Sequence, residues 1–557
     1  MFISYVSDRY FQWKIAGDDH FVALLFSQTN IDVHIRCEYI QETLPVSQSQ
    51  NQSSLADCYD LAVIGGGING VGIAADAAGR GLKVFLCEKD DLAQHTSSAS
   101  SKLIHGGLRY LEHYEFRLVR EALAEREVLL AKAPHIVKPM RFVLPHRPHL
   151  RPAWMIRAGL FLYDHLGKRK RLGASRSLRF GPGYPLKPAI SRGFEYADCW
   201  VDDARLVVLN AMAAREQGAR IQTRTRCLRA ERVEGVWEVV LQHADGRIES
   251  IRARALVNAA GPWVARFIKE DLKLDAPYGI RLIQGSHLIV PRLYEGEQAY
   301  ILQNEDQRIV FCIPYLDRFT LIGTTDREYT GDPAKVAITD AETDYLLNVV
   351  NAHFNHQLSR ADIKHTYSGV RPLCNDESDN PSAVTRDYTL AVSASQGQAP
   401  LLSVFGGKLT TYRKLAESAM AELKPFFAQM RGQWTADAPL PGGEDMTSVQ
   451  ALASQLLAEH PWLASDIALR WARTYGSRTW KILAGVRGPD DLGQALGAGL
   501  FAREVDYLCR EEWAVSVDDI LWRRTKIGLF LTAQEVEAVQ AYLQHAALAR
   551  ASAGQAA

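Results

Sequence analysis

Three glycines that follow a short apolar run would let the backbone approach a pyrophosphate closely. The run precedes Gly65, Gly67 and Gly70, and a second apolar run ends at Glu88. Gly65 and Gly67 allow a tight turn, and Gly70 lets the next helix pack on the strand with its N-terminus towards the phosphates. Glu88 can accept hydrogen bonds from ribose hydroxyls and would repel a 2′-phosphate. This spacing predicts a βαβ unit that binds FAD or NAD rather than NADP, and therefore redox chemistry.

Two later segments favour a flavin over a nicotinamide. Residues 258–262 place small residues around Gly261 after a strand, where the backbone could pass close to a flat ligand, although a plain turn is the rival interpretation. Gly406 and Gly407 form a second strand–glycine–helix junction, whose helix N-terminus would face another part of a long cofactor. Such a dipole stabilises the negative charge of a reduced flavin, which a nicotinamide does not need. The sequence therefore favours FAD.

The pattern of apolar residues predicts the elements that must position these glycines. Residues 108–131 are expected to form one helix, which Pro134 and Pro139 end. Strands are expected at 236–241, 248–257, 286–290, 308–313 and 320–322, and helices from residue 440 onwards. We predict an α/β chain with these parts: an unassigned extension (1–57), the first part of an FAD-binding domain (58–275), a β-rich substrate domain (276–365), the return of the FAD-binding domain (366–435) and a C-terminal helical domain (436–557).

Composition narrows the class of protein further. The chain has 557 residues, equal numbers of acidic and basic side chains, and eight cysteines without a Cys-X-X-Cys pair. This length predicts two or three domains, and the neutral charge argues against nucleic acid as a partner. The scattered cysteines indicate a reducing compartment without disulfides or zinc, and no metal is expected. No apolar run reaches the roughly eighteen residues of a membrane span, and no signal peptide is recognised.

Five longer segments occur in order along the chain: IGGGING (64–70), SSASSKLIHGGLRY (97–110), DDAR (202–205), SGVRP (368–372) and FGGKLTTYR (405–413). With these segments the chain resembles, from Tyr59 to near its C-terminus, the FAD-dependent, quinone-linked glycerol-3-phosphate dehydrogenases of aerobic bacteria. That family is part of the glutathione-reductase-like and D-amino-acid-oxidase-like flavoproteins. The resemblance implies their α/β FAD-binding fold, with an inserted β-rich substrate domain and a C-terminal helical domain.

The implied substrate, sn-glycerol 3-phosphate, needs cations for its phosphate and a base for its hydroxyl proton. The guanidiniums of Arg109 and Arg371 match phosphate oxygens, and Lys408 adds a point charge, although a surface ion pair is the rival interpretation for any single arginine. Either His287 or Arg371 could be the base, and that choice stays open. The resemblance implies catalytic roles for Arg371, His287 and Lys408, and substrate-binding roles for Arg109, Tyr110 and Arg386.

The loop after Glu88 offers donors to the cofactor. Serine hydroxyls and the Lys102 ammonium could cap the pyrophosphate and ribityl chain, and His105 could line the flavin edge; the alternative is a solvated serine-rich loop. The resemblance favours the cofactor. The residues expected to bind FAD are Gly65, Gly67, Gly70, Glu88, Ser97, Ser98, Ser101, Lys102, His105, Gly261, Gly406, Gly407, Lys408, Leu409 and Thr410.

Residues 141–172 combine basic and apolar side chains as an interfacial membrane segment does. Arginines and the cluster 168–171 are opposed only by Asp164, and they surround apolar residues such as Trp154 and Phe161. A helix packed on the core with solvated arginines is the alternative. Because a lipid-soluble quinone must be met at the bilayer, we expect a cytoplasmic protein attached peripherally, through anionic lipid, to the inner face of the cytoplasmic membrane.

The expected reaction oxidises sn-glycerol 3-phosphate to dihydroxyacetone phosphate by hydride transfer to FAD, with electrons passed to ubiquinone in the respiratory chain. A homodimer is expected. One alternative is a glycerol-3-phosphate oxidase that uses O2. A tRNA-binding flavoprotein is another, but the neutral charge and the lack of a nucleic-acid module argue against it. A non-catalytic FAD-bound scaffold would have no reason to set cations around the flavin.

Overall fold

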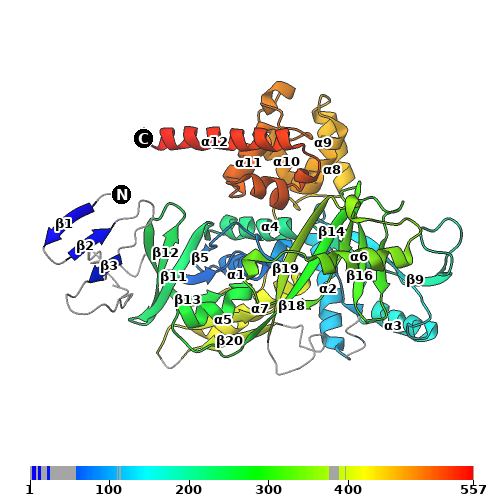
Figure 1. Cartoon of the computed structure of the whole chain (residues 1–557), viewed down its shortest axis with the longest axis horizontal. Coiled ribbons are helices and arrows are strands. Elements are labelled where there is room, and N and C mark those ends of the chain that lie inside the picture. The colour runs from blue at the N-terminus through cyan, green and yellow to red at the C-terminus, as the bar shows by residue number, and fades with distance from the viewer. Residues whose placement is uncertain are drawn as a thin grey trace. The chain divides into compact units, whose positions relative to one another are not determined.

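The structure, a computed structural model, describes residues 3–7, 10–13, 22–25, 58–108, 111, 114–167, 169–374, 388–394 and 397–555 (Figure 1). The chain divides into two compact units, Met1–Ala56 and Asp57–Ala557. The sequence predicted no fold for the first unit. Its described residues form an antiparallel sheet of these strands, in spatial order: β1 (Ile3–Ser7), β2 (Tyr10–Trp13) and β3 (Val22–Leu25).

The second unit contains the βαβ arrangement that the glycine spacing predicted. Strand β4 (Tyr59–Ile64) leads into helix α1 (Ile68–Gly79), and β5 (Val84–Cys87) returns parallel to β4. Strand β5 is buried throughout, as expected where helices cover both faces of a parallel sheet. The described strands of this first sheet run in the spatial order β10 (Arg220–Gln222), β5, β4, β13 (Ile248–Asn258), β12 (Val236–His243) and β11 (Thr225–Val233); β21 (Leu401–Phe405) pairs with β13, and β20 (Thr389–Ser393) with β21.

Strand β13 joins two parts of this sheet. Its beginning pairs antiparallel with β12, which confirms the predicted strands at 236–241 and 248–257. Its end pairs in parallel with β4 on one side and with β21 on the other. The glycine turns that follow β4 and β21 therefore lie at one edge of the sheet, next to the residue that follows β13. This is the edge where ligands bind in open α/β folds.

Small residues allow helix α1 to approach its neighbours closely. It packs against α4 (Asp203–Glu216) and α7 (Tyr412–Leu423). A Cβ at Gly72 would lie 2.8 Å from the ring of Tyr412, and one at Gly70 would lie 1.9 Å from the carbonyl oxygen of Gly65. These glycines fix α1 against the strand that precedes it, with its N-terminus at the carboxyl edge of the sheet.

The second sheet is larger than the predicted segment 276–365. It includes the predicted strands at 286–290, 308–313 and 320–322, but earlier parts of the chain also contribute strands. These earlier strands were missed because β9 is buried along most of its length and shows no polar alternation. The described strands run in the order β18 (Arg327–Glu328), β14 (Ile280–Pro291), β17 (Phe319–Gly323), β16 (Ile309–Tyr315), β15 (Ala299–Gln303), β7 (Val137–Pro145), β9 (Arg192–Val201) and β6 (Leu103–Ile104); β19 (His365–Cys374) pairs with β14, and β8 (Arg176–Arg179) with β9.

The helix predicted over residues 108–131 is shorter at its start. It is α2 (Phe116–Lys132), and the predicted end is confirmed to within one residue. Pro139 lies inside strand β7 instead of marking a helix boundary. The remaining described α-helices of this part of the chain are α3 (Ala153–His165), α5 (Val264–Arg266) and α6 (Asp340–His353).

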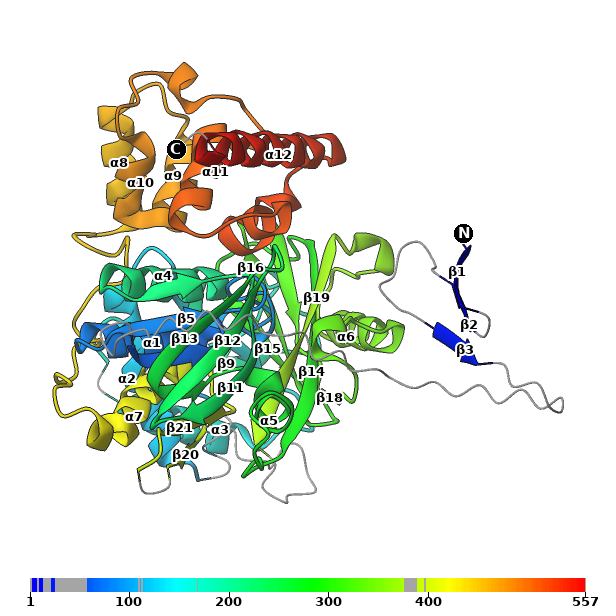
Figure 2. The same cartoon turned by 90° about the vertical axis from the view of Figure 1, so that its left-hand side faces the viewer.

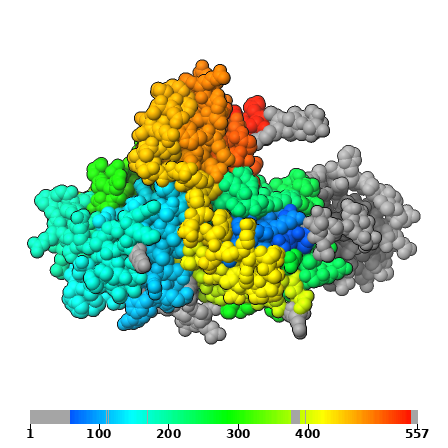
Figure 3. All heavy atoms as spheres, turned by 180° about the vertical axis from the view of Figure 1, so that it is seen from behind, coloured from blue at the N-terminus to red at the C-terminus, as the bar shows by residue number. Residues whose placement is uncertain are grey.

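The C-terminal part is helical, as predicted from residue 440 onwards, and it has a hydrophobic core of its own around Trp471 and Leu508. It lies above the two sheets in Figures 1 and 2, and Figure 3 shows it (orange) beside the segment near residues 400–440 (yellow). None of the described helices is long and apolar enough to cross a membrane. The elements of this part include α8 (Val449–Glu459), α9 (Ser465–Tyr475), α10 (Thr479–Leu483), α11 (Ala502–Glu511), the π-helix η12 (Asp519–Arg524), the short 3-10 helix η13 (Ile527–Leu529) and α12 (Ala533–Gln555).

Candidate active site

A cavity of about 1420 Å³ is lined by residues of both sheets. Its volume exceeds the roughly 300–1,000 Å³ of ordinary ligand pockets, so it can hold a dinucleotide together with a small substrate. The structure brings together at this cavity, of the residues predicted for the site, Gly65, Gly67, Glu88, Ser97, Ser101, His105, Gly261, His287, Arg371, Gly406, Gly407, Lys408, Leu409 and Thr410.

The first glycine turn has no room for side chains. Gly65 has a φ of +113°, and a Cβ there would lie 2.5 Å from the carbonyl oxygen of Ala259. Gly70 does not line the cavity; it lies beneath the turn and packs on Gly65, as the sequence predicted. The backbone is therefore open to a close-lying ligand at the N-terminus of α1.

Glu88 and Ser97 close the sides of this turn. The Glu88 carboxylate accepts hydrogen bonds from the backbone N–H of Gly66 at 2.6 Å and of Asp90 at 2.9 Å. Burial raises the pKa of Glu88, whereas these two donors act to lower it. The Ser97 hydroxyl accepts from the N–H of Ile68 at 3.0 Å. Both side chains thus shape the N-terminal end of helix α1, where a phosphate group would lie.

Asn69, which the sequence analysis overlooked, joins the two glycine junctions. Its Nδ2 donates to the carbonyl of Gly406 at 3.1 Å, and a Cβ on Gly407 would lie 2.7 Å from the same nitrogen. Its Oδ1 is buried and has no partner among the described residues. A buried acceptor next to two side-chain-free turns fits a long polar cofactor such as FAD. A polar residue in the first turn of the helix was the signal that could have identified it.

Besides Gly70, two predicted cofactor residues, Lys102 and Ser98, do not line the cavity. The Nζ of Lys102 donates to Asp203 at 2.7 Å and to the carbonyl of Ser98 at 3.1 Å, and Lys102 is buried. The Ser98 hydroxyl donates to the carbonyl of His95 at 3.4 Å. The positive charge of Lys102 is therefore paired with Asp203 inside the protein and is not offered to the cofactor. Predicted residues Arg109, Tyr110 and Arg386 lie outside the described part of the chain.

His287 lies on β14 and is almost fully buried. Its Nε2 is 2.9 Å from the hydroxyl of Ser101, and its ring stacks on Tyr367 with a centroid distance of 4.7 Å. Burial, with smaller effects of Lys102 and Arg371, holds the pKa of His287 well below 6.5. The imidazole is therefore neutral at neutral pH.

Arg371 lies on β19, directly beside β14. Its Nη2 donates to the carbonyl of Thr325 at 3.0 Å and to Asp326 at 3.2 Å. A Cβ on Gly285 would lie 3.0 Å from the same nitrogen, so this glycine makes room for the guanidinium. Thr325 and Asp326 also line the cavity, and nothing in the sequence pattern singled them out.

The low pKa of His287 predicts how stability depends on pH. In the unfolded chain a histidine titrates near pH 6.5, so below that pH the unfolded state binds one more proton than the folded state and stability falls. His287→Gln should remove up to ~1.4 kcal/mol per pH unit of that fall. Thermal unfolding midpoints, measured at several pH values between about pH 7 and about pH 5.5, give this loss of stability. His356→Gln, at an exposed position, is the control. An unchanged pH dependence in His287→Gln would contradict this burial.

Comparison with known proteins agrees with this geometry. Residues 60–413 match the model of the FAD dependent oxidoreductases, and residues 433–549 match that of the C-terminal domain of alpha-glycerophosphate oxidase. The fold and the site thus define an FAD-dependent oxidoreductase. The structure is similar to that of the glycerol-3-phosphate dehydrogenase from Bacillus halodurans complexed with FAD, with a TM-score of 0.69 and 27% identity over 88% of this chain and 90% of that chain.

Two relatives show to which family of FAD-dependent oxidoreductases the chain belongs. The chain is 74% identical over 502 residues to the glycerol-3-phosphate dehydrogenase of Pseudomonas tolaasii, which covers 89% of this chain and 97% of that protein. It is 59% identical over 485 residues to the aerobic glycerol-3-phosphate dehydrogenase of Escherichia coli strain K12, and this match covers 87% of this chain and 97% of that protein. The chain belongs to the FAD-dependent glycerol-3-phosphate dehydrogenase family. The predicted family, fold class and cofactor are confirmed.

Proposed function

We propose that this enzyme oxidises sn-glycerol 3-phosphate to dihydroxyacetone phosphate and passes the electrons to ubiquinone. The observation that carries the proposal is that His287, Arg371 and Lys408 line the same cavity as the glycine turns that fit FAD. Cations and a neutral base in a cofactor cavity suit a small phosphorylated alcohol. When bound, FAD supplies the two-electron acceptor.

The protein's own residues hold the substrate. Arg371 offers the forked donors that match phosphate oxygens, and Lys408 adds a second positive charge from the turn after β21. Thr325 and Asp326 fix the guanidinium of Arg371, so less conformational entropy is lost when the phosphate binds. Arg109, Tyr110 and Arg386 are proposed to complete the substrate site, as the resemblance implied.

His287 is the better candidate for the base. Arg371 is paired with Asp326, and a guanidinium has no acceptor lone pair with which to take up a proton. The Nε2 of His287 is engaged with Ser101, and its buried Nδ1 has no hydrogen-bond partner among the described residues. We therefore propose that the imidazole takes the hydroxyl proton of the substrate, with the Ser101 contact and the stacked Tyr367 holding the ring in place.

The proposed quinone acceptor is supported by an apolar side of the cavity. Met155, Ile156 and Leu162 of helix α3 line it, together with Ile309 and Phe311 of the second sheet. An apolar wall that begins at the surface suits a lipid-soluble oxidant. The test is to supply ubiquinone and O2 in parallel to the enzyme with sn-glycerol 3-phosphate. Quinone reduction that greatly exceeds peroxide formation supports the proposal, and stoichiometric peroxide would favour the oxidase alternative.

Helix α3 supports peripheral attachment to a membrane. Trp154 and Phe161 are 70% and 57% exposed, while Leu160 is buried, so part of the predicted apolar set packs on the core and part faces outwards. Figure 3 shows the segment around α3 (cyan) at an outer surface of this unit. Exposed aromatic groups beside arginines suit insertion among anionic headgroups. We propose attachment to the inner face of the cytoplasmic membrane; a homodimer remains a prediction from the sequence.

Replacing both exposed aromatic residues tests this attachment. The Trp154→Ser/Phe161→Ser variant should bind anionic vesicles at least about tenfold more weakly, because each large apolar side chain contributes roughly 1.5–3 kcal/mol when buried. Co-sedimentation with vesicles measures the change. Val515→Ser is the matched control, since Val515 is 60% exposed on the C-terminal part. Equal sedimentation of the variant and the control would contradict the proposed surface.

A further inference from the structure

The loop between β5 and β6 lines the cofactor cavity on both sides of a residue that faces away from it. Lys89, Ala93 and His95 line the cavity, whereas Asp91 does not and is buried. The loop also touches the glycine turn directly, because the N–H of Ala93 donates to the carbonyl of Gly66 at 3.2 Å. A shift of this loop would therefore move the turn that fits the pyrophosphate.

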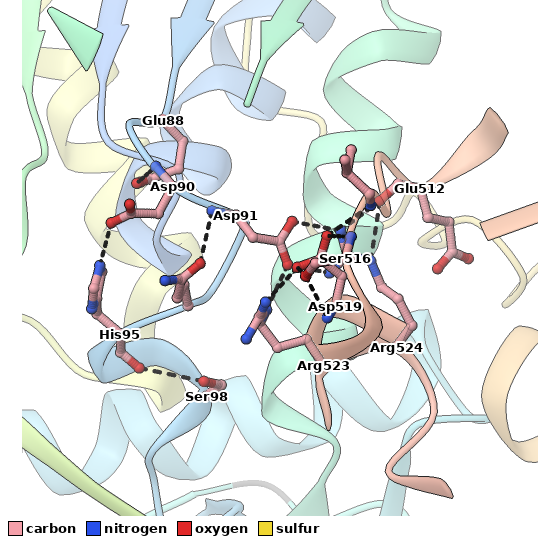
Figure 4. A network of polar contacts seen from close by, with 12 residues as sticks. Glu88, Asp90, Asp91, His95, Ser98, Glu512, Ser516, Asp519, Arg523 and Arg524 are labelled. Carbon is pink, nitrogen blue, oxygen red and sulfur yellow. Dashed lines mark hydrogen bonds and ion pairs between the residues drawn. The ribbon is translucent and has the colours of Figure 1, made fainter. Parts of the chain in front are cut away.

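Two arginines of the C-terminal helical part hold Asp91. Arg523 donates to its carboxylate through Nε at 2.5 Å, and Arg524 donates through Nη1 at 2.6 Å and Nη2 at 2.8 Å. The side chains of Asp91 and Arg524 are fully buried. Figure 4 shows this carboxylate between the two arginines, on the side of the loop opposite to His95. A fully buried, bidentate pair fixes both backbones, because neither charge has water as an alternative partner.

The segment that carries these arginines is itself fixed. The carboxylate of Asp519 accepts from the backbone N–H of Val515 at 2.7 Å and of Ser516 at 2.9 Å. It also pairs with Arg224 at 2.5 Å, and the N–H of Arg224 donates to the carbonyl of Asp90 in the cofactor loop at 2.8 Å. The loop and π-helix η12 are thus joined at two adjacent residues.

A second contact reaches the far end of the same loop. Lys526 pairs with Asp202, the N-cap of α4. The next residue, Asp203, accepts from the hydroxyl of Ser100 at 2.7 Å and from Lys102 at 2.7 Å. Arg523 and Arg524 therefore hold the loop at its middle directly, and Lys526 holds its end through α4.

We propose that Arg523 and Arg524 are positioning residues for FAD: by holding Asp91 they keep the cofactor loop in the shape that binds FAD, so that FAD binding and docking of the C-terminal part are coupled. Coupling of this kind is reciprocal, so bound FAD must stabilise the docked arginines as much as they favour FAD. The proposal goes beyond the proposed function, since it requires FAD but no particular substrate or electron acceptor.

Hydrogen exchange of the unaltered full chain with and without FAD gives the first test. Added FAD should slow exchange of the backbone amides of residues 515–526 at least about tenfold more than that of helix α8, which belongs to the same helical part and packs on α9. If FAD slowed both segments equally, or left residues 515–526 unchanged, the proposal would be overturned. This measurement needs no variant and no turnover.

Release of FAD from full-length variants gives the second test. Arg523→Gln removes one of the two donors while Arg524 still neutralises Asp91. Arg478→Gln is the matched control: Arg478 is 14% exposed, against 12% for Arg523, and pairs with Glu216 at the other end of α4. Arg523→Gln should raise the dissociation constant of FAD about tenfold or more, and Arg478→Gln less than about threefold. Equal effects of the two variants would overturn the proposal.

Discussion

Arg371→Ala should lower kcat/KM for sn-glycerol 3-phosphate at least about 100-fold while the flavin content stays unchanged. Hydrogen bonds between charged groups contribute roughly 1.5–3 kcal/mol each, and the guanidinium can offer two to a phosphate. Arg371 lines the cavity and donates to Thr325 and Asp326, which lie outside the glycine turns, so the cofactor should remain bound. Steady-state kinetics and the visible flavin spectrum measure the two quantities.

Arg281→Ala is the matched control for that variant. Arg281 lies on the neighbouring strand β14 and also pairs with a carboxylate, Glu328 at 3.0 Å, but it does not line the cavity. Its replacement should change kcat/KM less than about threefold, as is usual for an exposed ion pair. A loss of flavin from Arg371→Ala, or equal kinetics in the two variants, would contradict the substrate role of Arg371.

Gly70→Val should give a protein that retains less than about a tenth of the normal flavin, because α1 can no longer pack on the first glycine turn. A Cβ at this position would lie 1.9 Å from the carbonyl oxygen of Gly65, so the helix N-terminus must move away from the phosphate site. Flavin absorbance per protein measures the effect after purification with excess FAD.

Gly432→Ala is the control for the glycine substitution. Nothing lies within 4 Å of a Cβ at Gly432, so this variant should keep its flavin. Circular dichroism and gel filtration of both variants separate a local change from a failure to fold. A folded, fully yellow Gly70→Val protein would contradict the close packing of α1 on the turn.

The cofactor-binding half of the fold could be predicted because its glycines have a steric cause. The positions of Gly65 and Gly70 follow from the need for a tight turn and a close helix, and the structure places contacts there that no side chain could avoid. The second sheet could be predicted only in part. Strands β7 and β9 are buried along much of their length, and buried strands lack the alternation that identifies half-exposed ones.

The sequence could not show which side chains of the site face the cavity. His287, Arg371 and Lys408 come from distant parts of the chain, and the resemblance to a family placed them at one cavity, as the structure does. Lys102 and Ser98 lie in the expected loop, but the Lys102 ammonium turns to Asp203, a partner more than a hundred residues later. Local sequence does not show which face of a loop becomes buried, because the partners that decide it are distant in sequence.

Anaerobic mixing of the purified protein with sn-glycerol 3-phosphate, while the visible absorption band of oxidised flavin is followed, tests the proposed reaction most directly. The band should bleach at once and return when ubiquinone is added. A yellow protein whose band is unchanged by an excess of sn-glycerol 3-phosphate would contradict the proposed substrate and the roles given to His287 and Arg371.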